Sequence, residues 1–218
     1  MAGALLALAA VLPALRRLRR RQPERARIDA LYDQTSVLTD GAVRSIQSAD
    51  LTIDDDALEE LWTAMSLERL ARTYWRFLTR VTLGAIRVVY TPEQRWVVFM
   101  ARPFKLLTFA APEYDFDGEY GKVRWSIERG VLVSRRGRGG EGYLEIDVRR
   151  LGASSEPGRS RLHLDVEVAN FYPAIASGIS RRLYNATQSR IHVIVTLGFL
   201  RSLTKLDLAD SRVGRFVS

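Results

Sequence analysis

The sequence predicts an α+β fold in which a curved antiparallel sheet wraps around one long C-terminal helix, with further helices near the N-terminus. Two observations predict it. Residues 83–169 form a run of short segments in which apolar and polar residues alternate, the period of β-strands. A largely apolar stretch with helical spacing then runs from Pro173 to about Leu206. A bent sheet around a single helix tends to enclose a pocket, so we expect a ligand cavity between them.

Charge is concentrated at one end of the chain. The formal net charge is +8 over 218 residues, but seven arginines and one acid lie between Arg16 and Arg27. That segment carries +6 and leaves +2 for the other 206 residues. Nucleic-acid binding needs a basic face across the folded domain, so we expect no nucleic-acid partner. The chain has no cysteine, which excludes disulfides and thiolate chemistry.

Residues 1–27 form an apolar and basic segment that is typical of a membrane surface. Residues 3–15 are apolar and would span about 20 Å as a helix, too short for a hydrocarbon core of about 30 Å. The arginines follow the apolar part, which favours a cytoplasmic location for the rest of the chain. We expect peripheral attachment to an anionic inner membrane, unless the segment is a disordered tail or a misassigned start. The expected contacts are Leu5, Leu8, Leu12, Arg16, Arg17, Arg19, Arg20 and Arg21.

Residues 28–210 are predicted to form the folded domain, with 211–218 as a tail. Residues 28–50 are mixed and polar, which indicates a linker with one helical turn or short helix. Asp56 and Glu59 fit a capping box at the start of a helix, and Ser66 can cap a second helix that reaches Val81. Strands are then predicted over 85–90, 95–101 and 104–111. Both faces of 95–101 are apolar, so each face needs a cover.

Three later strands alternate more regularly. Residues 122–128, 144–149 and 162–168 each place apolar residues on one face and polar residues on the other. This pattern predicts an antiparallel sheet with one solvated face. The acids Glu145, Asp147, Asp165 and Glu167 lie on that polar face near arginines, which favours cross-strand ion pairs over a catalytic pair.

The C-terminal helix carries the polar residues from which we predict a pocket. Its polar side chains recur three and four residues apart, and a buried polar group needs a partner. The predicted pocket residues are Trp125, Tyr172, Tyr184, Gln188, His192 and Thr196. The alternative is that His192 only satisfies a core carbonyl or a tyrosine hydroxyl. His163 lies on a polar strand face and is predicted to be a surface histidine.

The sequence contains no recognisable catalytic or cofactor motif. It lacks a nucleophile elbow, and its glycine-rich segment 135–142 opens no helix, so it does not fit a dinucleotide loop. Asp115 to Ser126 departs from a calcium loop at its glycine and at its last position. We therefore expect neither a metal nor a cofactor.

The order of elements resembles the START and polyketide-cyclase-like superfamily, also termed SRPBCC or helix-grip proteins. The stretches GKVRWSIERGVLV (121–133), GYLEIDVRRL (142–151) and YNATQSRIHVIVTLGFLRSL (184–203) are similar to uncharacterised bacterial members. The resemblance covers residues 50–206 and implies an apolar ligand held between a curved sheet and a long C-terminal helix. Members usually open with a strand, which residues 35–43 or 51–53 would supply.

Three functions remain open from the sequence. The first is non-enzymatic binding or transport of a lipid or another apolar small molecule at the cytoplasmic face of the membrane. The second is a small cyclase, dehydratase or hydrolase that uses His192 as a general base. The third is a structural or interaction module whose strand 95–101 docks a partner or a second copy, giving a homo-oligomer.

Overall fold

The computed structural model describes residues 24–100, 105–172 and 193–211. Residues 193–202 are helical, as predicted for the C-terminal helix, and residues 173–192 of that predicted helix lie outside the described residues. The other elements are β1 (Ala26–Val37), β2 (Val43–Asp54), α2 (Asp55–Leu61), α3 (Ala64–Val81), β3 (Ile86–Tyr90), β4 (Gln94–Phe99), β5 (Lys105–Ala110), β6 (Glu113–Phe116), β7 (Tyr120–Arg129), the 3₁₀ turn η1 (Arg135–Gly137), β8 (Tyr143–Ala153), β9 (Arg159–Phe171) and the 3₁₀ turn η2 (Leu203–Lys205).

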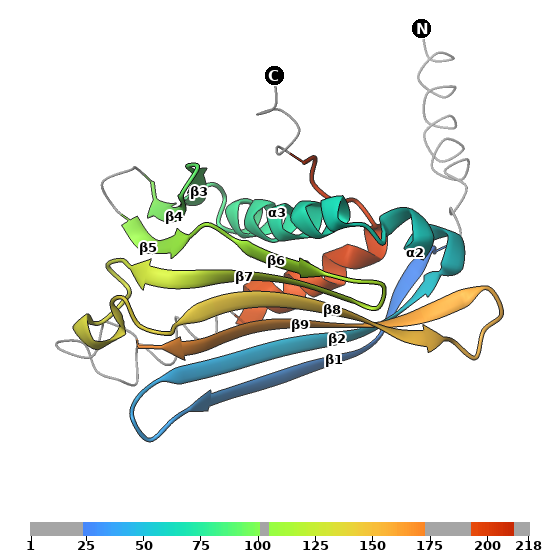
Figure 1. The fold of residues 1–218 in the computed structure, drawn as a ribbon, viewed down its shortest axis with the longest axis horizontal. Coiled ribbons are helices and arrows are strands. Elements are labelled where there is room, and N and C mark those ends of the chain that lie inside the picture. Colours follow the sequence, from blue (N-terminus) through green and yellow to red (C-terminus); the bar gives the residue numbers. More distant parts are fainter. Residues whose placement is uncertain (1–23, 101–104, 173–192, 212–218) are drawn as a thin grey trace, which may run out of the picture.

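The described strands form a single curved antiparallel sheet. Nine strands pair in the order β1-β2-β9-β8-β7-β5-β4-β3, and β6 also pairs with β7 (Figure 1). Both β5 and β6 lie on the same edge of β7, where Phe109 pairs with Ile127 and Tyr114 pairs with Val123. Pro112 stands between β5 and β6 and has no N–H to donate, which favours a break between these two strands.

One face of the sheet is buried beneath α3 and the C-terminal helix, as Figure 1 shows. The predicted alternation is confirmed, because Val123, Trp125 and Ile127 of β7 are all buried. The same holds for Leu144, Ile146 and Val148 of β8 and for Leu162, Leu164 and Val166 of β9. These positions follow from the period of two along a strand, since every second side chain points to the core.

Aromatic rings join the helices to the sheet. Trp75 of α3 lies 5.3 Å from Trp125 and 5.6 Å from Phe109, measured between ring centroids. Its neighbour Tyr74 lies 5.2 Å from Phe199 of the C-terminal helix in an edge-to-face arrangement. Each such pair contributes about 0.5–1.5 kcal/mol beyond the area that it buries. Together they fix α3 and the C-terminal helix on the same layer.

The prediction for residues 28–50 is wrong. This segment forms most of the β1–β2 hairpin, so the predicted N-terminal helices α2 and α3 follow two strands rather than opening the domain. Ser45 and Gln47 share a face with Ala49 and Leu51 and are buried with them, so polar residues interrupt the apolar alternation. On the edge strand β1 most residues are exposed, which removes the apolar signal there as well.

Candidate ligand-binding cavity

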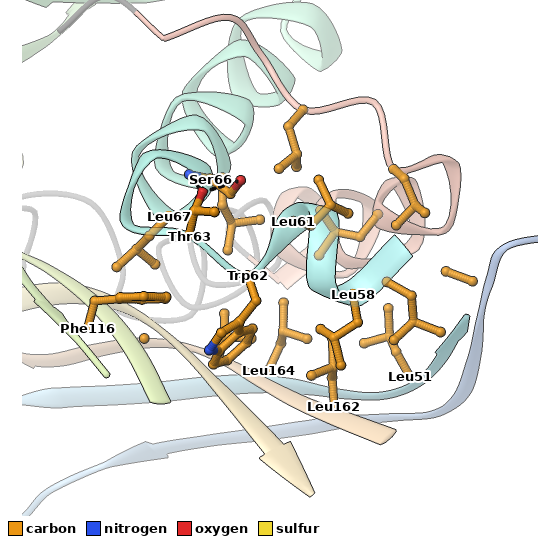
Figure 2. A pocket seen from close by; sticks show the side chains of 18 residues that line it. Leu51, Leu58, Leu61, Trp62, Thr63, Ser66, Leu67, Phe116, Leu162 and Leu164 are labelled. Atoms are coloured by element: carbon orange, nitrogen blue, oxygen red, sulfur yellow. Dashed lines mark hydrogen bonds between the residues drawn. The ribbon is translucent and has the colours of Figure 1, made fainter. Parts of the chain in front are cut away.

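A cavity of about 100 Å³ lies at one end of the sheet, between the sheet and the helices α2 and α3. Figure 2 shows leucines closing it from several elements. Its floor comes from the sheet, its roof from α2 and the first turns of α3, and one wall from η2 and the residues after it. The central contributors are Leu51 (β2), Leu162 and Leu164 (β9), Leu58 (α2), Leu67 (α3) and Leu206 (after η2).

Contacts of α2 with β9 hold the roof over the floor. Ser160 of β9 donates a hydrogen bond of 2.6 Å to Asp55, the first residue of α2, and Arg159 of β9 forms an ion pair of 3.0 Å with Asp54, the last residue of β2. Asp54 is the N-cap position and its side chain makes no capping hydrogen bond, so the predicted capping box is not formed. Asp55 instead joins the start of α2 to β9.

The N-terminus of α3 supplies the polar atoms of the cavity. Thr63, not Ser66, is the N-cap, and its hydroxyl accepts a 3.0 Å hydrogen bond from the Ser66 N–H. The Thr63 hydroxyl also donates to the Ser66 hydroxyl at 3.0 Å. The Ser66 proton then has no acceptor among the described residues, which leaves one donor available to a ligand.

Two aromatic side chains form one side of the cavity, which we call the aromatic rim (Trp62 and Phe116). Their ring centroids are 5.7 Å apart, and the Trp62 indole donates to the Asp117 carbonyl at 3.2 Å. Arg150 lies 5.4 Å from the centre of the Trp62 ring and pairs with Glu59 of α2 at 2.6 Å. Because Trp62 is only half-buried, the rim lies where the cavity meets the surface.

Gly121 leaves room for the aromatic rim. It has the same parity as the buried residues Val123 and Trp125 on β7, so it faces the core without a side chain. A Cβ at this position would approach the Phe116 ring to 3.3 Å and the Leu67 side chain to 3.6 Å. The space beside these two side chains therefore depends on a glycine.

The chain after η2 crosses the cavity as a strap, defined here as residues 206–209. Leu206 and Leu208 line the cavity. The strap is held by α3, because Arg69 donates to the carbonyls of Ala209 (3.1 Å) and Leu208 (3.4 Å), and Thr73 accepts from the Ala209 N–H at 2.8 Å. Leu206 has a left-handed backbone with φ of 51°, which is rare for a branched side chain.

The lining offers apolar surface and little chemistry. None of the described residues that line the cavity is titratable, and Thr63 and Ser66 are its hydroxyl-bearing residues. Within the described ranges no group of three or more acids or histidines could hold a metal. The arrangement can exclude water from an apolar ligand and donate one hydrogen bond to it.

The predicted pocket residues lie elsewhere or outside the described part. Trp125 is 1% exposed and packs against Trp75, within the core rather than at the cavity. Tyr172 donates a hydrogen bond of 2.5 Å to Asp40, and this bond raises the pKa of the Tyr172 hydroxyl. Neither residue lines the cavity. Tyr184, Gln188 and His192 lie outside the described residues, so an enzymatic role of His192 stays a prediction.

Thr196 is a predicted pocket residue whose own hydroxyl group is buried without a clear partner among the described residues. It is fully buried, and its hydroxyl makes no hydrogen bond of normal geometry within the described chain. It lies near the Tyr74 hydroxyl. Burial raises the pKa of Tyr74 to about 12, and the proximity of the Thr196 hydroxyl acts in the opposite direction. Thr196 does not line the cavity.

The polar face of the sheet carries ion pairs, as predicted. Arg149 contacts Asp147 at 2.9 Å and Asp165 at 3.5 Å. His163 is half-buried and its two ring nitrogens lie 2.6 Å from Asp50 and 3.1 Å from Asp165. Both ring nitrogens thus face carboxylates of the polar face.

The cavity could not be predicted from the sequence, because each leucine that lines it has the same sequence pattern as an ordinary core residue. Gly121 is the exception, since a glycine at an inward strand position often marks close packing or reserved space. The predicted membrane contacts Leu5 to Arg21 lie outside the described residues. None of the described helices combines the length and apolar character needed to cross a bilayer.

The architecture is consistent with a helix-grip fold, a curved antiparallel sheet with a C-terminal helix, and it contains an apolar cavity. No family model matches the chain, and no curated protein matches it. A truncated norcoclaurine synthase from Thalictrum flavum is similar at 11% identity and a TM-score of 0.37, over 76% of this chain and 94% of that one.

Two conserved bacterial proteins show similarly low identities and TM-scores. One from Enterococcus faecalis has 13% identity and a TM-score of 0.30, over 83% of this chain and 82% of that one. A conserved protein from Geobacillus kaustophilus has 11% identity and a TM-score of 0.34, over 74% and 95% of the two chains. Likenesses this distant assign neither a ligand nor a reaction to the chain.

Proposed function

We propose that this protein binds an apolar small molecule or the end of a lipid chain in the cavity between α2, α3 and the sheet, without catalysing a reaction on it. The observation that carries the proposal is a cavity of about 100 Å³ whose lining is apolar apart from two hydroxyl-bearing residues. Empty cavities with such linings stay dry and take up apolar guests, and an engineered one of about 150 Å³ binds benzene.

The size of the cavity limits what it can enclose. Each methylene transferred from water into it contributes about 0.8 kcal/mol. A few methylenes therefore give weak binding, and a longer chain would gain affinity by extending past the aromatic rim. The Ser66 hydroxyl would donate to a polar atom of the ligand within the cavity. The basic residues 16–27 would hold the protein at the cytoplasmic face of an anionic membrane, near a supply of lipid.

A matched pair of leucine substitutions tests the proposal. Leu164 of β9 lines the cavity and Leu144 of β8 does not, yet both face the core and are almost fully buried. Leu164→Phe places a larger side chain into the cavity, whereas Leu144→Phe overpacks a filled part of the core. With the fluorescent fatty acid cis-parinaric acid as the probe, we expect Leu164→Phe to weaken binding about tenfold and Leu144→Phe to leave it within about twofold.

Stability provides a second readout of the same pair. Overpacking a filled core costs about 1–3 kcal/mol, so Leu144→Phe should lower the free energy of unfolding more than Leu164→Phe, which enters empty space. Failure of the wild-type protein to bind the probe, or equal loss of binding in both variants, would contradict the proposal. Binding is measured at a temperature where both variants show native circular dichroism.

A further inference from the structure

A cluster of exposed apolar side chains lies at the end of α3 opposite the cavity. Its members are Val81, Leu83, Phe99 and Met100, which are 45%, 96%, 43% and 70% exposed, and we call it the apolar tip. The two pieces of chain are neighbours, because Ile86 pairs with Phe99 and the Met100 N–H donates to the Ala85 carbonyl at 2.7 Å. In Figure 1 this end of α3 meets β3 and β4, far from α2.

The backbone of the apolar tip is built into an uncommon conformation. Leu83 and Met100 have φ values of 51° and 54°, in the left-handed region that bulky residues rarely adopt. Hydrogen bonds fix this conformation, since the Leu83 N–H donates to Arg80 and the Gly84 N–H to Thr79. Residues in such conformations concentrate at functional sites, where the surrounding structure imposes them.

Positive charge surrounds the apolar tip. Arg80 and Arg87 are both exposed, and the Arg87 guanidinium donates to the Gly84 carbonyl at 3.0 Å, beside Leu83. From residue 80 to residue 100 the chain has three arginines and one acid. That acid, Glu93, lies in the turn at the other end of the β3–β4 hairpin. The described residues provide no ion-pair partner for Arg80 or Arg87.

We propose that the apolar tip inserts into the boundary between headgroups and acyl chains of an anionic membrane, with Arg80 and Arg87 at the lipid phosphates. Apolar side chains flanked by arginine are the composition of interfacial membrane contacts. A second copy of the chain fits less well, because a stable protein interface uses about 20–30 residues a side and the tip has four.

The inserted tip would leave the cavity clear of the membrane. Leu70 is the last residue of α3 that lines the cavity, and Val81 of the tip follows 11 residues later, so at about 1.5 Å per residue the helix separates the two by roughly 17 Å. Tip insertion therefore does not rest on the proposed ligand binding. Variants of the tip should bind cis-parinaric acid as the wild-type protein does, so failure of one proposal is distinguishable from failure of the other.

Single cysteines can report the insertion, since the full chain contains none. Leu83→Cys and Met100→Cys carry the environment-sensitive fluorophore NBD at the tip. Leu151→Cys is the control, because Leu151 is 45% exposed on β8, away from the tip. With vesicles of 30% phosphatidylglycerol in phosphatidylcholine, we expect emission at the two tip positions to rise at least about twofold and shift to the blue. Emission at the control position should not change.

Charge reversal tests the role of the arginines. Arg80→Glu with Arg87→Glu should weaken tip insertion into the anionic vesicles by about tenfold. Arg161→Glu with Arg201→Glu changes the net charge equally at exposed positions on β9 and the C-terminal helix, and should change insertion by less than about threefold.

Two results would overturn the proposal. In the first, the protein cosediments with vesicles while NBD at Leu83 and Met100 stays in water, so another surface carries the binding. In the second, the emission changes without vesicles and grows with protein concentration, so the tip contacts a second copy. Labelled variants must melt within a few degrees of the wild-type protein for either result to count.

Discussion

Thr73→Val should loosen the strap that crosses the cavity. The Thr73 hydroxyl accepts the Ala209 N–H at 2.8 Å and donates to the Arg69 carbonyl at 2.7 Å. Valine has a similar shape but no hydroxyl, so the buried Ala209 N–H loses its acceptor. Ala209 is 4% exposed, and water cannot replace the hydroxyl unless the strap opens. The substitution therefore acts on the strap more than on the helix.

The size of the effect follows from the cost of a buried N–H without a partner, about 1–3 kcal/mol. At about 1.4 kcal/mol for each factor of ten, the opening equilibrium of the strap should rise roughly 5- to 100-fold. The loss in the global free energy of unfolding should be no larger than this local cost. The strap is still held by Arg69, and Arg76 donates to the Asp207 carbonyl at 2.9 Å.

Amide hydrogen exchange measured by NMR tests this prediction, because in the limit of fast reclosing the exchange rate reports the opening equilibrium. Exchange at Ala209 should accelerate by the stated factor, and cis-parinaric acid should dissociate faster since Leu206 and Leu208 line the cavity. Thr79→Val is the control, as the Thr79 hydroxyl has no partner among the described residues. Unchanged exchange at Ala209 in Thr73→Val would refute the reasoning.

Two further predictions concern stability. Burial raises the pKa of Tyr74 to about 12, above an unfolded value of about 10. The contribution of the neutral Tyr74 side chain to the free energy of unfolding is therefore complete below pH 10 and is lost as pH rises towards 12. By pH 11 the free energy of unfolding of the wild-type protein should fall by about 1.4 kcal/mol through this residue. Denaturant unfolding should show a fall smaller by that amount in Tyr74→Phe. Equal falls in the two proteins would contradict the assignment of the raised pKa to Tyr74. A Cβ at Gly130 would lie 2.2 Å from the Leu106 carbonyl oxygen, whereas a Cβ at Gly139 would meet nothing within 4 Å, and φ is positive at both. Chemical denaturation should show that the free energy of unfolding falls by more than about 3 kcal/mol in Gly130→Ala and by about 1 kcal/mol in Gly139→Ala. Comparable losses would show that backbone strain, and not the steric clash, causes the destabilisation.

Much of the sheet could be predicted from the sequence. The inward faces of β7, β8 and β9 follow from alternation, because each side chain's direction depends only on its position along its own strand. The helix over residues 193–202 was predicted from its polar spacing despite its β-branched residues. The β1–β2 hairpin was not predicted, since Ser45 and Gln47 occupy core positions that the alternation rule reserves for apolar residues.

The candidate site could not be predicted in the same way. Leu51, Leu58 and Leu164 come from three elements, and each is indistinguishable in sequence from a side chain that fills a core completely. The hydrogen bond between Asp55 and Ser160 joins α2 to the sheet, and these two residues are 105 positions apart. The residues predicted for the pocket instead followed a polar pattern along one helix.

By itself the sequence determined which residues of β7, β8 and β9 face inward, where the net charge lies and the absence of thiol chemistry, because these are properties of composition or of local spacing. The tertiary structure alone decided that empty space remains beneath α2, that a C-terminal strap closes it and that four apolar side chains stay uncovered beyond α3. A cavity is the volume left between surfaces that belong to distant parts of the chain. Its existence depends on distances between elements, which no local pattern encodes.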